Sequence, residues 1–468
     1  MHPPAPDGNS RLSFWPRVRA YAVPAPMIET ATARRSVGDW SGACAAAGVD
    51  VDLRLRDLAR THGRELAARV RQDLRHLAPD LLRWHMPRVA PDGLLRPGLT
   101  VALARYDTTG PDGPRPVHLV VRTPPAWADG GQRMSLTLWD GARLRNGAGR
   151  HPHPRPGPRF RLDLHRHLWD ARHAHELRHR AGAGRPNADS PEAGEAVPSG
   201  LLPPGHHCAV DRWADEARTV LRDAGRTSGA VVVRAGAGHR LVLTLPGDGD
   251  GDGSAPYTLR TGPPDTARAA PVLPLLPDAA THVLPDLQLL RAGAIEAGRL
   301  HPLVASALVP GHTATGPPPV PDPGQPHLVD CRGARHRIGL VDGVLVPLDH
   351  AEDEIRREEL LAELTGTPLP CLQTIDRAHR RPDCLTGVRE RLDHGDITGA
   401  LTVVENLLGP NARLRGGPLR EELEAAALRR LEHGLYRSGL AGPADGRVAP
   451  APARPVGRRS HPRHATLH

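Results

Sequence analysis

The chain has 468 residues, and all 61 of its lysine-plus-arginine positions are arginine. The absence of lysine excludes a P-loop, a protein kinase and Schiff-base catalysis in their usual forms, because each depends on a lysine amine. The formal net charge of +9 belongs to the first part of the chain, since residues 1–200 hold 30 Arg against 20 acidic residues and the remainder is close to neutral. Guanidinium groups pair with carboxylates and phosphates, so this region suits an acidic partner or a nucleic acid.

A chain of this length exceeds the size at which a single hydrophobic core stops growing, which predicts more than one domain. Its strand-like and helix-like runs predict an α+β, multi-domain fold, with antiparallel β hairpins or meanders beside helices and a mostly helical C-terminal part. Segments rich in Pro and Gly set the expected boundaries. These give an N-terminal extension at 1–27, a basic Trp-containing α+β domain at 28–180, a Pro/Gly linker at 181–207, a middle α+β domain at 208–309, a Pro-rich linker at 310–326, a β-hairpin plus helical domain at 327–440 and a disordered basic tail at 441–468.

The first region predicts a helix, a meander and a second helix. Apolar residues recur every three or four positions over 52–84, which is typical of an amphipathic helix that must bend or stop near Pro79. A further helix is expected over 163–180. Between the two helices, turn sequences separate three strand-like runs that predict an antiparallel meander, at 100–106, 117–123 and 133–139.

The remaining elements follow in the same alternating pattern. A helix is expected over 211–223, a hairpin from the runs 230–234 and 240–245, and a helical stretch over 285–308. Asp342-Gly343 joins two apolar runs, and this dipeptide tolerates the positive φ of a tight hairpin turn. Four helices are expected after it, at 352–366, 386–395, 396–409 and 418–439.

One motif resembles an enzyme site. His175-Glu176-Leu177-Arg178-His179 fits H-E-x-x-H within the helix expected over 163–180. Histidines four residues apart share one helical face and can hold Zn²⁺, while the glutamate can act as a general base on metal-bound water. The run resembles the metzincin pattern, but Arg185 stands at the third-ligand position and no Met follows Met134. A structural or adventitious histidine cluster is therefore the competing interpretation, and no other catalytic, cofactor-binding or metal-binding residue is indicated.

The five cysteines are far apart, odd in number and contain no CxxC pair. This spacing argues against a disulfide framework and against a structural zinc site. The N-terminus has no apolar core of a signal peptide, and no run of apolar residues is long enough to span a bilayer. We therefore expect a cytoplasmic protein with no membrane contact.

Two passages carry a resemblance to a known group of proteins. GDWSGACAAAGVDVDLRLRDL at 38–58 and DLRHLAPDLLRWHMPR at 73–88 resemble uncharacterised proteins of high-GC actinobacteria that accompany MoxR-type ATPase and von Willebrand A systems. The resemblance extends over about residues 36–440. It contains no functional motif, so it implies an accessory, multi-domain protein and transfers no catalytic residue.

These observations predict a non-catalytic interaction or adaptor protein that needs no cofactor. Its basic first domain would meet a protein partner, either an acidic protein or an ATPase, through arginine, and its helical end would offer a protein-binding groove. The first alternative is a zinc-dependent hydrolase with Glu176 as the catalytic residue and His175 and His179 as the metal ligands. The second is a nucleic-acid-binding protein that uses the arginines of 52–88.

Overall fold

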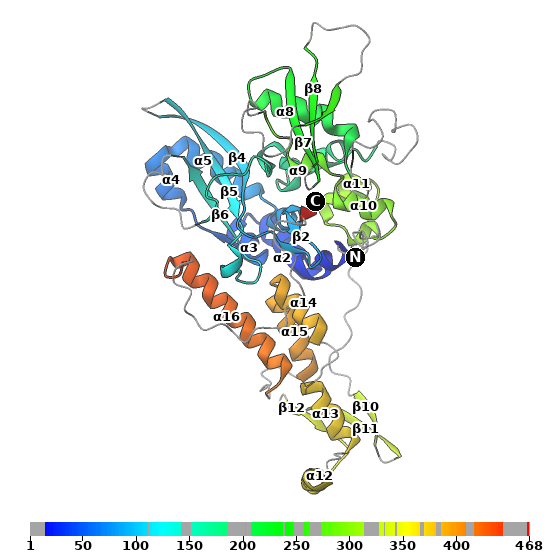
Figure 1. The fold of residues 1–468 in the computed structure, drawn as a ribbon. Coiled ribbons are helices and arrows are strands. Elements are labelled where there is room, and N and C mark those ends of the chain that lie inside the picture. Colours follow the sequence, from blue (N-terminus) through cyan, green and yellow to red (C-terminus); the bar gives the residue numbers. More distant parts are fainter. Residues whose placement is uncertain are drawn as a thin grey trace, which may run out of the picture. The chain divides into compact units, whose positions relative to one another are not determined.

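The computed structural model describes residues 15–110, 113–141, 151–184, 202, 207–236, 239–247, 257–262, 273–312, 327–331, 333–341, 344–365, 369–380, 385–408, 416–442 and 466–467. The chain divides into two compact units. The first comprises Met1–Trp127, Gln132–Thr315 and Ala453–His468, and the second comprises Ala128–Gly131 and Gly316–Pro452. The predicted fold class is confirmed, because several small sheets lie beside helices and the C-terminal part is mostly helical (Figure 1). Segment 208–309 lies in the first unit together with 28–180, except for Ala128–Gly131.

The predicted meander forms the main sheet of the first unit. β4 (Thr100–Gly110), β5 (Gly113–Arg122) and β6 (Met134–Asp140) are antiparallel neighbours, and β1 (Val49–Val51) lies parallel to β6 at the edge. Side chains alternate between the two faces of a strand, so one face of β5 enters the main hydrophobic core with Val117, Leu119 and Val121.

Three helices occupy the region where one bent helix is expected. They are α4 (Leu55–His62), α5 (Arg64–His76) and α6 (Pro79–His85). The stop near Pro79 is confirmed, since this proline begins α6. The break between α4 and α5 was not predicted, and it falls at Gly63, whose φ of 91° favours glycine. Leu58, Leu66 and Leu74 of these helices pack in the same core as the sheet.

The chain before α4 also packs against this unit. A short π-helix at Val18–Ala22 is followed by α2 (Ala25–Ser36) and α3 (Trp40–Ala46). Trp15 and Val18 are buried beside Trp84 of α6. The described part of the expected N-terminal extension is therefore packed into the unit.

The prediction of a helix over 163–180 is wrong. Short 3₁₀ turns occupy most of it, at Leu162–Leu164, Arg166–Leu168 and Ala174–Glu176, and they end in a single helical turn, α7 (Leu177–Arg180). The cause is long-range pairing. Trp169 accepts a backbone hydrogen bond from Ala78, and Ala171 donates one to His76, so these backbone groups do not make helical bonds. The amphipathic pattern gave no sign of this partner.

The later part of the first unit agrees more closely with the predictions. α8 (Val210–Asp223) covers the antiparallel hairpin of β7 (Gly229–Gly236) and β8 (His239–Leu245), which β9 (Thr258–Thr261) extends. The helical stretch expected over 285–308 is instead broken. It contains α10 (Pro285–Arg291), a 3₁₀ turn (Ala297–Arg299) and α11 (Pro302–Leu308), and it follows the short α9 (Asp278–Thr281).

The second unit begins with a three-stranded antiparallel sheet. β10 (His327–Cys331) pairs with β11 (Ala334–Val341), which pairs with β12 (Val344–Pro347), so the predicted hairpin is confirmed although Asp342 and Gly343 lie outside the described residues. Five helices follow: α12 (Glu352–Thr365), α13 (Pro370–Arg380), α14 (Leu385–His394), α15 (Ile397–Leu408) and α16 (Pro418–Ser438). Of these, α13 was not predicted.

Several expectations fall on other parts of the chain. The linkers at 181–207 and 310–326 and the tail at 441–468 lie largely outside the described residues. In the tail, Thr466–Leu467 forms β13, which pairs with β2 (Arg88–Val89), itself paired with β3 (Leu94–Leu95). None of the helices among the described residues combines the length and the apolarity needed to cross a bilayer.

Candidate metal centre

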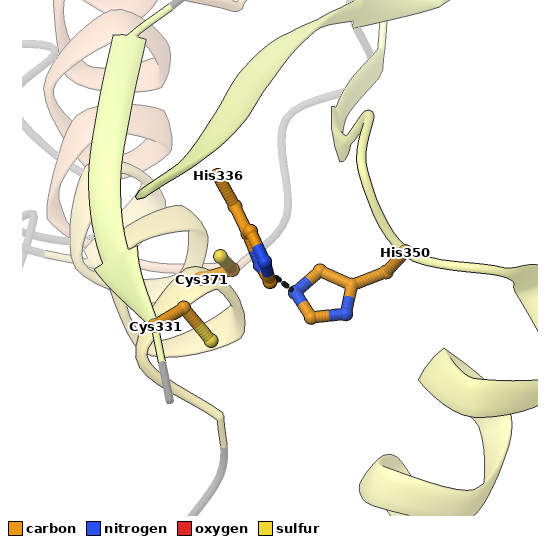
Figure 2. A group of neighbouring side chains, drawn as sticks. All are labelled: Cys331, His336, His350 and Cys371. Carbon is orange, nitrogen blue, oxygen red and sulfur yellow. Dashed lines mark hydrogen bonds between the residues drawn. The ribbon is translucent and has the colours of Figure 1, made fainter. Parts of the chain in front are cut away.

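Four side chains with metal-binding atoms converge in the second unit. The Sγ atoms of Cys331 and Cys371 and one ring nitrogen from each of His336 and His350 all lie within 4.8 Å of one another (Figure 2). Both cysteines are fully buried and are free thiols. Two thiols and two imidazoles form one of the ligand sets that proteins use for structural zinc.

The sheet places two of these residues on one face. In the β10–β11 register, Cys331 is opposite Ala334 and Val329 is opposite His336. Directly opposed residues point to the same side of a sheet, and residues two apart on a strand share a face. Cys331 and His336 therefore project from the same face.

The other two residues come from the segments that follow the sheet. His350 lies just after β12, and Cys371 is the second residue of α13, a helix that packs on the sheet through Ile375. Asp349 holds the segment before His350 in place, because it accepts hydrogen bonds from the backbone N–H of Arg337 at 2.7 Å and from Arg337 Nη2 at 2.6 Å. Hydrogen bonds from Arg337 lower the pKa of Asp349 to about 2, so the Asp349 carboxylate remains ionised at neutral pH.

The two imidazoles face each other. His336 Nδ1 and His350 Nε2 are 2.7 Å apart, and the rings meet edge to face with their centroids 4.3 Å apart. The other nitrogen of His350, Nδ1, lies 3.2 Å from Glu354 Oε2. A carboxylate on the far nitrogen fixes the tautomer and orientation of a metal-binding histidine. Nε2 of His350 is thereby left as the atom that faces the cluster.

The cysteine environment favours protonated thiols before a metal binds. Burial raises the pKa of Cys371 to about 11, with further contributions from the hydrogen bond and charge of Cys331. A Zn²⁺ ion binds thiolate and displaces the proton, so affinity for the metal increases with pH.

The donor atoms of the cluster need small shifts to reach the dimensions of a zinc site. Zn–N bonds of about 2.0–2.1 Å and Zn–S bonds of about 2.3 Å give tetrahedral ligand separations of about 3.3–3.8 Å. The donor atoms lie within 4.8 Å of one another and the His336 and His350 nitrogens are 2.7 Å apart, so a bound zinc ion would separate these two nitrogens and draw the wider pairs of donors together.

The residues of the H-E-x-x-H motif are arranged differently. His175 lies in a 3₁₀ turn and His179 in the single α-helical turn that follows it, rather than in the long helix expected over 163–180. Both side chains are exposed, and His175 Nδ1 hydrogen-bonds the Arg172 carbonyl at 2.8 Å. Glu176 is 2.6 Å from His173 Nδ1. Among the described residues, His175, Glu176 and His179 do not belong to any group of three or more side chains that could hold a metal ion.

The candidate metal centre was not predicted from the sequence, because its four residues are separated by 4, 13 and 20 residues. Only the sheet register and the packing of α13 bring them together. A usable signal was present in the hairpin predicted around Asp342-Gly343, since Cys331, His336 and His350 lie on or beside its strands. Cys384 is outside the described residues, and Cys44 and Cys208 are buried elsewhere.

Comparisons with known proteins give one sequence relationship. No family model and no solved structure matches the chain. A segment of 214 residues is 31% identical to the 4-hydroxy-tetrahydrodipicolinate reductase of Beutenbergia cavernae, and it covers 45% of this chain and 75% of that protein. On this identity and coverage the chain belongs by sequence to the family of that reductase, a relationship that does not by itself assign its activity.

Proposed function

We propose that the chain is a non-catalytic adaptor protein whose second unit is an interaction module stabilised by one zinc ion. The observation that carries this proposal is the convergence of Cys331, His336, His350 and Cys371 with their donor atoms within 4.8 Å of one another. Four protein ligands complete a tetrahedral shell and leave no position for substrate or water, which is the arrangement of structural rather than catalytic zinc.

The helix next to this centre supplies the proposed interaction surface. α12 carries Glu354, which contacts His350, so the metal would fix the start of this helix. Further along α12, Leu360, Leu361 and Leu364 are 59%, 47% and 86% exposed. Clustered exposed leucines on a helix are typical of a helix-in-groove contact. The first turn of α12 is acidic, so the proposed groove on the partner is apolar with basic residues at its rim.

A reductase activity is not part of the proposal. Dinucleotide-dependent reductases commonly use a parallel sheet whose first strand leads through a glycine-rich turn into a helix. Among the described strands, β1 and β6 are parallel and every other pairing of named strands is antiparallel. The described sheets therefore lack the parallel arrangement on which that mode of dinucleotide binding depends.

Zinc content tests the metal-binding part. Purified full-length protein is expected to contain about one zinc per chain, and Cys331→Ser and Cys371→Ser are expected to lose it. The matched control is His175→Ala/His179→Ala, which is expected to retain the metal. Loss of zinc from the control alone would instead support the hydrolase.

The adaptor part is tested by site-specific photo-crosslinking in cells. A photoreactive residue at Leu364 is expected to give a discrete crosslinked protein, and the same residue at Glu424, exposed on α16, is the control. Chelation or Cys371→Ser is expected to remove the product, because the metal positions α12. The absence of a product at Leu364, or equal products at both positions, would refute the interaction surface.

A further inference from the structure

The first unit contains a polar cavity of about 570 Å³ that takes no part in the proposed zinc centre. It lies between α5, β4, the 3₁₀ turns after β6 and the end of α8. Pockets of about 300–1,000 Å³ are the size that holds small-molecule ligands. Five arginines and four aspartates line it: Arg69, Arg105, Arg166, Arg172, Arg222, Asp73, Asp107, Asp163 and Asp223.

The aspartates of the cavity are already neutralised. Asp73 accepts hydrogen bonds from Tyr106 Oη at 2.6 Å and from Arg172 Nη2 at 2.8 Å, and it lies 2.5 Å from Arg166 Nη2. Arg161, beside the cavity, pairs with both Asp163 and Asp223, at 2.5 Å and 2.8 Å. These carboxylates therefore do not compete strongly for further cations.

Two of the lining arginines have no carboxylate partner among the described residues. The Arg69 guanidinium lies 5.2 Å from the centre of the Tyr106 ring. Arg222 makes only long hydrogen bonds, to the Arg218 carbonyl at 3.4 Å and to Thr219 Oγ1 at 3.3 Å. Both arginines line the cavity and are exposed, so their guanidinium groups remain available to an anion.

A third arginine lies in the cavity wall with its charge already paired. Arg166 Nη2 lies 2.5 Å from Asp73 Oδ1, and Arg166 Nε lies 3.5 Å from Asp170 Oδ2. Arg69 and Arg222 are therefore the lining arginines that remain for an anion.

We propose that this cavity binds a small phosphorylated molecule. Phosphate oxygens match the fork of donors on a guanidinium, and Arg69 and Arg222 present such donors at one cavity. The Tyr106 hydroxyl donates a hydrogen bond to Asp73, and its ring lies against the Arg69 guanidinium. Tyr106 is therefore a positioning residue. Asp107 at the edge of the cavity is paired with Arg105 at 3.0 Å, so the net positive charge of the lining is small, which favours a compact ligand over a long polyanion.

The proposal is tested with pyrophosphate and full-length protein by isothermal titration calorimetry. Saturable binding is expected, and Arg69→Gln and Arg222→Gln are each expected to weaken it by about 10-fold or more, since each removes charge-assisted hydrogen bonds. Arg71→Gln is the matched control, because Arg71 is exposed on α5 but does not line the cavity. Tyr106→Phe is expected to weaken binding less than either arginine variant.

Competition with other ligands identifies the chemical class of molecule that the cavity binds. Inorganic phosphate is expected to displace pyrophosphate and to bind more weakly, whereas citrate is expected to compete poorly. Tighter binding of citrate would overturn the phosphate class in favour of a polycarboxylate, and tighter binding of duplex DNA would overturn it in favour of a nucleic acid. No saturable binding of pyrophosphate, or an equal loss in Arg71→Gln, would overturn the site itself. The exposed position of both arginines keeps the variants folded, which circular dichroism checks.

Discussion

Replacing Glu354 by glutamine probes the zinc centre without touching a metal ligand. Glu354 Oε2 lies 3.2 Å from His350 Nδ1, so the carboxylate orients the ring and makes Nε2 a better donor to the metal. Loss of such a partner typically weakens metal affinity by about 10–100-fold. The Glu354 side chain is 42% exposed, and solvent screening weakens its effect, so the expected loss of metal affinity is near the lower end of this range. We therefore expect a loss of about 10-fold, equivalent to about 1.4 kcal/mol.

The assay is a competition for zinc between the protein and a chromophoric chelator of known affinity at neutral pH. Glu352→Gln is the matched control, since Glu352 is exposed in the same turn of α12 and has no contact with the imidazole. The control is expected to keep the affinity of the parent protein. Equal affinities for the Glu354 variant and the parent, or equal losses in both variants, would refute the assignment of His350 as a ligand through Nε2.

Three further predictions concern the stability of the first unit, measured as the free energy of unfolding in urea. Burial alone would raise the pKa of Glu216, but the hydrogen bonds and charges of His165 and Arg180 outweigh it and hold the pKa well below its usual range. The ionised carboxylate therefore stabilises the folded state above about pH 4.3, and this stabilisation is lost as the pH falls further. Glu216→Gln is expected to lower the free energy of unfolding by about 3 kcal/mol at pH 7, and its difference from the parent protein is expected to shrink below pH 4. A difference that does not change with pH would contradict this. Leu103→Ala removes a fully buried side chain of the main core and is expected to cost about 2–5 kcal/mol, so a loss below about 1 kcal/mol would show that the site collapses around the smaller residue. Arg83→Met leaves buried carbonyls without their donor and is expected to cost about 3 kcal/mol, and a neutral result would mean that water replaces the guanidinium.

The parts of the fold that depend on local sequence were predictable. The meander and the hairpin before α12 are set by alternating apolar residues and by turn sequences such as Asp342-Gly343, which act within a few residues. The stop at Pro79 follows from the missing N–H and the fixed φ of proline. These signals do not require knowledge of any distant partner.

The failures share a dependence on distant contacts. The helix expected over 163–180 is replaced by turns because its backbone pairs with His76 and Ala78. Arginines 83 and 88 lie within the segment assigned to nucleic-acid contact, yet both are fully buried and donate to backbone carbonyls. Composition and periodicity do not distinguish such an arginine from a solvated one.

The candidate metal centre was missed for the same physical reason. Its four residues lie on two strands, a connecting segment and the start of α13, and only the tertiary arrangement brings them together. The H-E-x-x-H motif, by contrast, was visible in the sequence, and its residues lie in a 3₁₀ turn and one α-helical turn rather than in the long helix expected there.

X-ray absorption at the zinc edge of the purified full-length protein tests the central claim most directly. The account predicts a four-coordinate shell of two sulfur atoms at about 2.3 Å and two nitrogen atoms at about 2.0 Å. Cys371→Ser is expected to lose the metal or to show a single sulfur atom. A shell of nitrogen and oxygen atoms without sulfur would contradict the assignment of Cys331 and Cys371 and would place the metal elsewhere in the chain.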